Sequence, residues 1–179
     1  MTKDQINHEN KNEPVKKGGK FTWTKVGVIV AIIVLIGGYF LMKANPPLQI
    51  TATAYNEDNT SVVLGVGNTG FSGILLKEVK VNAGEDLPEV KLQVADASKG
   101  LIVVDDFKYD EEGYSFINLD SRYIKTGTTF KEIMTEEGEM VEVPEVFGIS
   151  IIHDEPIETI HIKYSHFGVS YEETVELTH

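Results

Sequence analysis

The sequence contains no cysteine among its 179 residues. Without thiols the chain cannot form disulfides, thiolate metal sites or a cysteine nucleophile, and it cannot be tethered through a lipidated cysteine. The fold must therefore be stabilised by its core alone. Eukaryotic extracellular domains of this size often use disulfides, so their absence favours a bacterial envelope, most simply that of a Gram-positive cell.

Basic residues are scarce in the last three quarters of the chain. Residues 46–179 carry nine lysines and arginines against 25 acids, a net charge of −16, whereas residues 1–25 carry six lysines against three acids, a net charge of +3. A surface that acidic repels nucleic acid, and it favours cations, basic partners or solubility alone. We therefore expect no nucleic-acid partner.

Sequence signatures of common catalytic sites are also missing. There is no phosphate-binding glycine loop and no dinucleotide fingerprint. The segment 70–73 (GFSG) lacks the G-x-S-x-G pattern of a nucleophile elbow. Carboxylates are so abundant that no single pair indicates acid and base roles. The sequence therefore predicts no catalytic residue and no cofactor, and we do not expect an enzyme.

One long apolar run is present. Residues 26–42 (VGVIVAIIVLIGGYFLM) carry no charge, and as a helix they would extend about 25 Å at roughly 1.5 Å per residue. Eleven of them are Val, Ile, Leu or Phe, which favours insertion by about 3 to 7 kcal/mol in total. Snorkelling of Lys25 and Lys43 can cover the shortfall against a bilayer core of about 30 Å. We predict a transmembrane helix over residues 26–42.

The flanking charges predict the orientation of this helix. Four lysines lie just before it and only Lys43 just after it, which favours a cytoplasmic tail over residues 1–25 and an extracellular domain over residues 46–179 of a single-pass protein in the cell membrane. A cleaved signal peptide is an alternative, but the run exceeds the usual apolar length of about 7 to 15 residues. A buried core helix is disfavoured because the run is apolar on every face. Gly27 and Ala31 form a small-xxx-small pair that would permit dimerisation, although such pairs are common by chance.

Apolar residues beyond residue 49 recur with the period of two that is typical of strands. The runs are Ile50, Ala52 and Ala54; Val62, Leu64 and Val66; Val90, Leu92 and Val94; Ile149 and Ile151; Ile160, Ile162 and Tyr164; and Val169, Tyr171, Val175 and Leu177. Turn residues separate the runs. We predict a mainly β, immunoglobulin-like antiparallel sandwich of about eight strands, preceded by the single transmembrane helix.

Two local features interrupt this pattern. Ile74 and Leu76 are even-numbered whereas Val79 and Val81 are odd-numbered, so a β-bulge near Lys77 is predicted. One short helix is predicted after Thr129, because Thr129 and Glu132 fit a capping box and Gly138 can end the helix.

Two segments carry a resemblance. Residues 62–82 (VVLGVGNTGFSGILLKEVKVN) resemble the beginning of bacterial immunoglobulin-like envelope modules, in which a strand ends in Asn-x-Gly. Residues 147–177 are similar to the closing strands of small uncharacterised signal-anchored envelope proteins of Gram-positive bacteria. The resemblance implies a fold and a location, and it assigns no functional residue.

Candidate ligand groups occur in two places. His153, His161 and His166 lie in the last third of the chain beside Glu155 and Glu158, and imidazole with carboxylate can bind zinc. Their spacing matches no helical HExxH motif, so solvated histidines are the competing interpretation. Asp105, Asp106, Asp110, Glu111 and Glu112 could collect calcium, but the EF-hand order of ligands is missing. No metal site is therefore predicted.

Two functions remain open from the sequence. The first is a membrane-anchored extracytoplasmic binding module, whose partner would be an envelope protein or a cell-wall component. The alternative is a metal-dependent, membrane-tethered enzyme that uses His153, His161 and His166 with nearby acids.

Overall fold

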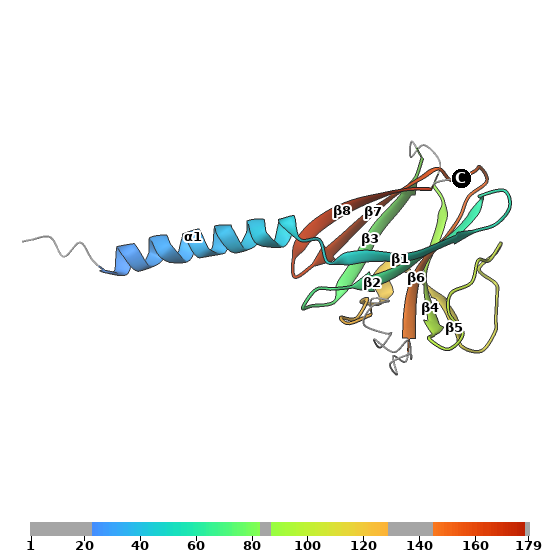
Figure 1. Cartoon of the computed structure of the whole chain (residues 1–179), viewed down its shortest axis with the longest axis horizontal. Coiled ribbons are helices and arrows are strands. Elements are labelled where there is room, and N and C mark those ends of the chain that lie inside the picture. The colour runs from blue at the N-terminus through green and yellow to red at the C-terminus, as the bar shows by residue number, and fades with distance from the viewer. Residues whose placement is uncertain (1–22, 83–86, 129–144, 178–179) are drawn as a thin grey trace, which may run out of the picture. The chain divides into compact units, whose positions relative to one another are not determined.

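The computed structural model describes residues 23–82, 87–128 and 145–177. Its elements in chain order are α1 (Trp23–Ala44), β1 (Leu48–Tyr55), β2 (Ser61–Asn68), β3 (Ile74–Val81), β4 (Glu89–Asp96), β5 (Tyr114–Ile117), the 3₁₀ helix η1 (Leu119–Ser121), β6 (Glu145–Ile152), β7 (Thr159–His166) and β8 (Val169–Glu176) (Figure 1). Contacts divide the chain into two compact units, residues 1–38 and 39–179. The last turn of α1 therefore belongs to the same unit as the strands.

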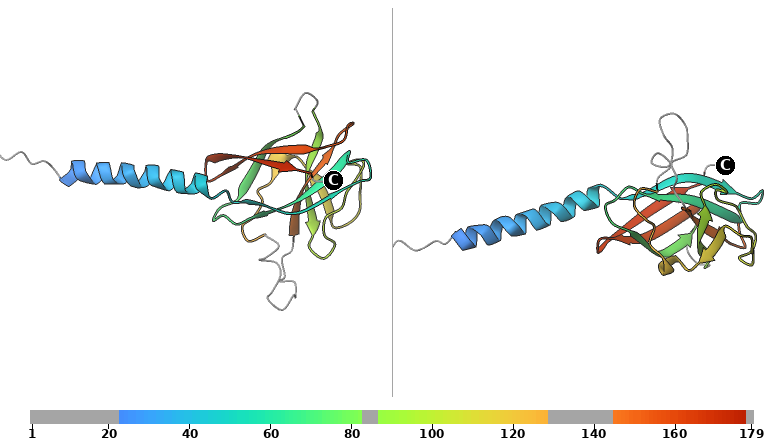
Figure 2. Two further views of the ribbon diagram at one scale, coloured as in Figure 1. Left: turned by 45° about the horizontal axis from the view of Figure 1, so that its top comes forward. Right: turned by 90° about the horizontal axis from the view of Figure 1, so that it is seen from below.

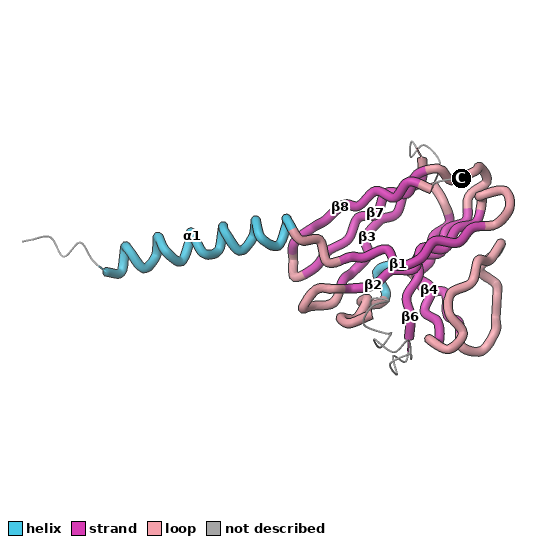
Figure 3. The backbone as a smooth tube through the Cα atoms, viewed as in Figure 1, coloured by secondary structure: helices cyan, strands magenta, loops and turns pink. Residues whose placement is uncertain are grey.

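The strands form two antiparallel sheets, and the predicted β sandwich is confirmed. One sheet has the order β1-β2-β6-β4-β5 and the other has the order β3-β7-β8; Figure 2 shows these strands from two further directions. Outside α1 and η1 the described chain is strand and loop (Figure 3). Side chains from both sheets form one hydrophobic core, in which Leu64, Leu76, Phe147 and Ile162 are almost fully buried. Each such side chain contributes about 1.5 to 3 kcal/mol by leaving water.

The helix α1 confirms a segment that is long and apolar enough to cross a membrane. The candidate span is Lys25–Ala44, a strongly apolar stretch of 20 residues, none of which is buried inside the protein. The alternative of a buried core helix is therefore wrong. A helix that is apolar around its whole axis requires apolar surroundings, and the described part of the protein does not supply them.

The predicted bulge in β3 is confirmed at the expected residue. Leu76 pairs with Tyr164 of β7, whereas Glu78 pairs with Lys163, so the register shifts across Lys77. Both Leu76 and Val79 then face the core, although one number is even and the other is odd.

The predicted core face of β1 is only partly right. Ile50 pairs with the core residue Val66, but Ala52 pairs with Gly65 because the register shifts between residues 50 and 52. All four residues after this shift, 52–55, are exposed. Ala52 and Ala54 therefore do not face the core, because this half of β1 has no buried face.

The outer face of the larger sheet is covered by the connection between β4 and β5, residues 97–113. Every residue of β2 is buried, which requires cover on both faces. Gly65 of β2 pairs with Gly148 of β6, and a Cβ at Gly148 would lie 3.0 Å from the Leu101 side chain. The two glycines thus leave a depression into which Leu101 packs.

Ion pairs attach the segment after η1 to the first residue of β6. Arg122 and Lys125 both pair with Glu145, at 2.7 Å and 2.8 Å, and the two cations lower the pKa of the Glu145 carboxyl. The short helix predicted after Thr129 lies outside the described residues. The helical turn that the structure shows, η1, is an element that the sequence did not predict.

Candidate functional site

The three candidate histidines lie in different parts of the sandwich. His153 follows β6, where its Nδ1 lies 3.1 Å from the backbone N–H of Glu155. His161 is exposed in the middle of β7, with its Nδ1 3.0 Å from Oγ1 of Thr174 on β8. His166 ends β7 and is buried, 3% exposed, on the opposite side of the pleat from His161.

This placement gives no support to the alternative of a histidine metal centre. Among residues 23–82, 87–128 and 145–177, no three His, Cys, Asp or Glu side chains gather as a set that could hold a metal ion. Strand alternation explains the separation, because positions 161 and 166 differ by an odd number and therefore face opposite sides of β7.

Two acidic residues of the β4–β5 connection, Asp105 and Glu111, form hydrogen bonds or an ion pair with neighbouring side chains. The carboxylate of Asp105 accepts hydrogen bonds from Ser61 at 3.2 Å and Asn56 at 3.4 Å. Glu111 accepts one from the Tyr109 hydroxyl and pairs with Lys99 at 3.4 Å, and these contacts lower the pKa of Glu111. In the described structure these carboxylates stabilise the connection that covers the sheet.

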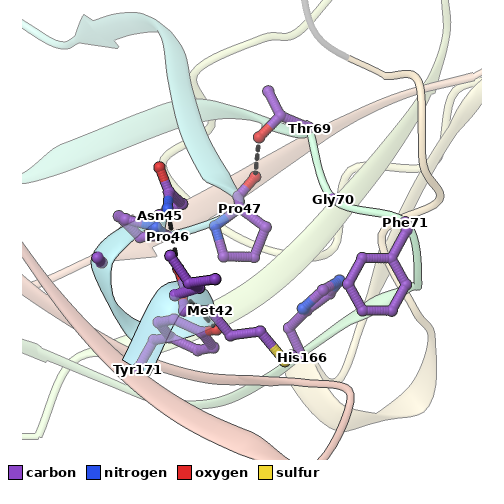
Figure 4. A pocket seen from close by; sticks show the side chains of 11 residues that line it. Met42, Asn45, Pro46, Pro47, Thr69, Gly70, Phe71, His166 and Tyr171 are labelled. Carbon is purple, nitrogen blue, oxygen red and sulfur yellow. Dashed lines mark hydrogen bonds between the residues drawn. The ribbon is translucent and has the colours of Figure 1, made fainter. Parts of the chain in front are cut away.

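A concave feature lies at the end of the sandwich where the chain leaves α1 (Figure 4). It is a groove of about 640 Å³ between residues 41–47, residues 69–71 and the side chains of His166 and Tyr171. Its walls are mostly apolar, with two prolines and aromatic rings from three parts of the chain. Sequence patterns did not indicate this groove, because its residues come from the end of α1, from loops and from strands that lie far apart in the sequence.

Hydrogen bonds fix the segment between helix and sandwich. The backbone N–H and the hydroxyl of Thr69 both donate to the carbonyl of Pro47, at 2.9 Å and 3.1 Å. The Tyr171 hydroxyl donates to the carbonyl of Met42 at 3.0 Å. Lys43 lies 5.1 Å from the centre of the Tyr171 ring, where a cation–π attraction of about 0.5 to 1 kcal/mol is expected. Residues 42–47 are therefore attached to the sandwich and are not a free linker.

Asn68 organises the loop that follows β2. Its side chain is fully buried, and its amide donates to the carbonyls of Ser72 at 2.8 Å and Ile124 at 3.0 Å. Its carbonyl accepts from the backbone N–H of Gly70 at 2.8 Å. One side chain thus fixes the Asn-x-Gly turn that the sequence showed, and it also joins that turn to the segment before β6.

Two phenylalanines project from this end of the sandwich. Phe71 in the β2–β3 loop is 69% exposed and Phe167 in the β7–β8 turn is 67% exposed. Their ring centres lie 5.1 Å apart in an edge-to-face arrangement. We call this pair the aromatic tips. From the sequence, Phe167 falls in a turn and Phe71 falls in segment 70–73, which was considered only as a nucleophile elbow; a bulky apolar residue beside turn residues is the signal that could have identified both.

His166 lies beneath the aromatic tips. Its Nε2 accepts a hydrogen bond from the backbone N–H of Ser72 at 3.3 Å, its Nδ1 has no partner among the residues that the structure describes, and its ring contacts Phe71 with centres 4.9 Å apart. Burial lowers the pKa of the imidazole, because the charged form loses hydration there. The neutral ring is the form that this end of the fold accommodates.

Acid is therefore expected to weaken the fold through His166. The lowered pKa in the folded state means that the unfolded chain binds the proton more readily. The contribution of His166 to the free energy of unfolding is fully present above the ordinary pKa of 6.5 and is lost as the pH falls below it. The loss is about 1.4 kcal/mol for each pH unit by which the pKa in the folded protein lies below the pKa in the unfolded chain. Urea unfolding of the full-length protein in mild detergent at pH 7.5 and 5.5 measures the loss.

Two variants assign this pH dependence to its source. His166→Gln keeps an acceptor for the Ser72 N–H without a titrating ring, so its stability should change little over this range. His161→Gln alters an exposed histidine and should behave as the natural protein does. If His161→Gln removed the dependence and His166→Gln kept it, the role given to His166 would be wrong.

Comparisons of the chain with protein-family models, with curated proteins and with solved structures found no significant match. The function is therefore inferred from the residues and geometry described above.

Proposed function

We propose that the protein is a single-pass membrane protein of a bacterial envelope whose sandwich is an extracytoplasmic binding module. The supporting observation is the direct succession of an apolar helix and a folded sandwich. The candidate span ends at Ala44 and β1 begins at Leu48, so three residues join them. Such an arrangement holds a compact domain at a membrane surface, where its loops are available to neighbouring molecules.

The orientation follows from the lysines. Lys16, Lys17, Lys20 and Lys25 precede the apolar run and Lys43 alone follows it. An excess of positive charge marks the cytoplasmic side of a membrane helix. In this proposal the amino terminus is cytoplasmic and residues 46–179 are outside.

The strand order supports an immunoglobulin-like module. Constant-type immunoglobulin domains have strands in the order ABED in one sheet and CFG in the other. Lettering β1, β2, β3, β4, β6, β7 and β8 as A to G gives the same two orders, β1-β2-β6-β4 and β3-β7-β8. The strand β5 is then an additional edge strand, and it belongs to the connection between D and E.

The binding surface in this proposal is the end of the sandwich opposite the start of β1. The β1–β2 turn (residues 56–60) and the β6–β7 loop (residues 153–158) meet there. The N–H of His153 donates to the carbonyl of Thr60 and the N–H of Ile157 donates to the carbonyl of Asn59, both at 2.9 Å. We call these two segments the distal loops. They contain five acidic residues and no lysine or arginine, which favours a partner with a basic surface.

Crosslinking in cells tests this proposal. A photoreactive amino acid at Asp58 or Asp154 of the full-length chain should yield one specific adduct. In the chain with the reporter at position 154, reversing two charges with Glu57→Lys and Asp58→Lys should reduce the adduct. Glu172, exposed on β8 away from the distal loops, is the matched control position. Equal adducts at Asp154 and Glu172, or none at either distal position, would contradict a binding role for the distal loops.

A further inference from the structure

We propose that the aromatic tips, Phe71 and Phe167, enter the headgroup layer of the bilayer that α1 spans, so that the sandwich is seated on the membrane surface. This inference rests on the proposed function, because it requires α1 to be in the membrane. It assigns to this end of the sandwich a partner, the lipid surface, in addition to the protein or cell-wall partner of the distal loops.

The first support is the short distance along the chain. Between Ala44 at the end of the candidate span and Leu48 at the start of β1 there are three residues, and each residue extends at most about 3.6 Å. Thr69 is bonded twice to the carbonyl of Pro47 within this connection. Phe71 lies two residues after Thr69, so the tips are attached beside the point where the chain leaves the span.

The second support is the conformation of Phe167. It is the first residue of a two-residue turn between His166 and Val169, which pair with each other, and both Phe167 and Gly168 have positive φ, 49° and 77°. Turns with two positive φ angles favour Asn followed by Gly. A phenylalanine there is strained as well as exposed, and strain of this kind is a pointer to function.

The third support is the amount of each ring that packing leaves uncovered. Phe71 contacts both His166 and Phe167, yet each phenylalanine remains about two thirds exposed, at 69% and 67%. The contacts among these rings therefore do not explain why two large apolar side chains are exposed on the surface. Aromatic rings are favoured at the boundary between headgroups and acyl chains, where the exposed faces of the tips would leave water.

Charge at this end of the sandwich is compatible with a membrane surface. Residues 39–47, 69–73 and 166–168 contain no acidic residue, and the first of these segments contributes Lys43. The strongly negative charge of the chain after residue 45 is carried by other segments. Anionic headgroups would therefore meet the tips without direct repulsion from a neighbouring carboxylate in these segments.

Tryptophan reporters in the full-length protein test the inference. Trp23 is the only tryptophan, so Trp23→Phe gives a background in which Phe71→Trp, Phe167→Trp, Leu35→Trp and Leu87→Trp each place one reporter. The proteins are reconstituted into vesicles of phosphatidylcholine and phosphatidylglycerol, one set with lipids brominated near the headgroup and a second set with lipids brominated deep in the acyl chain, which report on the centre of the span. Leu87 is 84% exposed and lies beyond the end of β3 that is opposite Phe71, so it is the matched control.

The expected result is quenching of the Phe71→Trp and Phe167→Trp reporters that is at least about threefold stronger than quenching of the Leu87→Trp reporter. Quenching of the tip reporters equal to that of Leu87→Trp, with Leu35→Trp strongly quenched by the deep bromines, would overturn this inference and leave the proposed function intact. An unquenched Leu35→Trp reporter would overturn the proposed function itself. A blue-shifted but unquenched reporter at the tips would place them against a second copy of the chain, and it would also overturn the inference.

A second variant separates membrane contact from folding. Phe167→Asn suits the positive φ of the turn, so the thermal midpoint should be unchanged or higher. In that background, quenching of the Phe71→Trp reporter should fall by about half or more, because half of the apolar tip has been removed. Unchanged quenching in a folded Phe167→Asn protein would contradict the role of Phe167.

Discussion

Replacing Asn68 with alanine is expected to lower the free energy of unfolding by about 3 to 5 kcal/mol. This is the largest loss that we expect from replacing any single polar residue in a loop or at the end of a strand. The variant would leave the carbonyl of Ser72 and the N–H of Gly70 without their partner, and the carbonyl of Ile124 would keep only its backbone bond from Ile74. Each buried polar group left unpaired costs about 1 to 3 kcal/mol. Because Asn68 is fully buried, water cannot readily take its place.

Urea unfolding of the full-length protein in mild detergent, followed by the β-sheet circular dichroism signal, measures this loss. Asn118→Ala is the matched control, since Asn118 is exposed and accepts one hydrogen bond from Lys91; its effect should stay within about 0.5 kcal/mol. Asn68→Asp tests the donor alone, because it keeps the shape and the acceptor but directs a carboxylate at two carbonyl oxygens. A loss below 1 kcal/mol for both Asn68 variants would contradict the structural role of this side chain.

Introducing two arginines into the apolar run, Ile33→Arg with Ile36→Arg, is expected to remove the protein from the membrane fraction. Each arginine near the centre of a span costs about 2.5 to 3.5 kcal/mol, so the pair cancels the total gain of about 3 to 7 kcal/mol from the apolar side chains. Both isoleucines are exposed, at 62% and 53%, so the change does not disturb a protein core.

Carbonate extraction of isolated membranes, followed by immunoblotting, measures retention in the bilayer. The control is Ile33→Leu with Ile36→Leu, which keeps the apolar character and should remain in the membrane pellet. Equal retention of the arginine and leucine variants would show that α1 is not what holds the protein at the membrane.

The strand pattern of this chain could be predicted where strong apolar residues mark the buried face. In β3 the change from Ile74 and Leu76 to Val79 and Val81 revealed the bulge at Lys77, because each of these side chains faces the core. In β1 a similar bulge after Ile50 left no change in the spacing of apolar residues in the sequence. Ala52 and Ala54 continue the period of two in the sequence, but residues 52–55 are exposed on both faces of the strand.

A loop that covers the outer face of a sheet has no regular spacing of apolar residues, so this segment could not be predicted in the same way. Residues 97–113 look like a loop, yet Leu101 packs over the paired Gly65 and Gly148 of the outer face. The two glycines carried the only local signal, since a glycine in a central strand often marks a close approach by another segment.

The candidate site was the part least accessible to prediction. The histidines attracted attention by their chemistry, but strand alternation separates them. The aromatic tips and the groove are assembled from turns that are far apart in the sequence, and they meet only because β7 pairs with β3 and β8 in this sandwich. A phenylalanine before glycine in a tight turn was the one visible sign, and the pattern of apolar residues could not distinguish it from an ordinary turn.

Labelling of single cysteines tests the central claim most directly, because the natural chain has no cysteine that would react. Asn10→Cys places a thiol in the tail before α1, and Asp154→Cys places one in the distal loops. With a membrane-impermeant maleimide added to spheroplasts, the membrane topology proposed here predicts immediate labelling of Asp154→Cys and labelling of Asn10→Cys only after the membrane is permeabilised. Labelling of Asn10→Cys with protection of Asp154→Cys, or protection of both, would contradict a single-pass protein with its sandwich outside the cell.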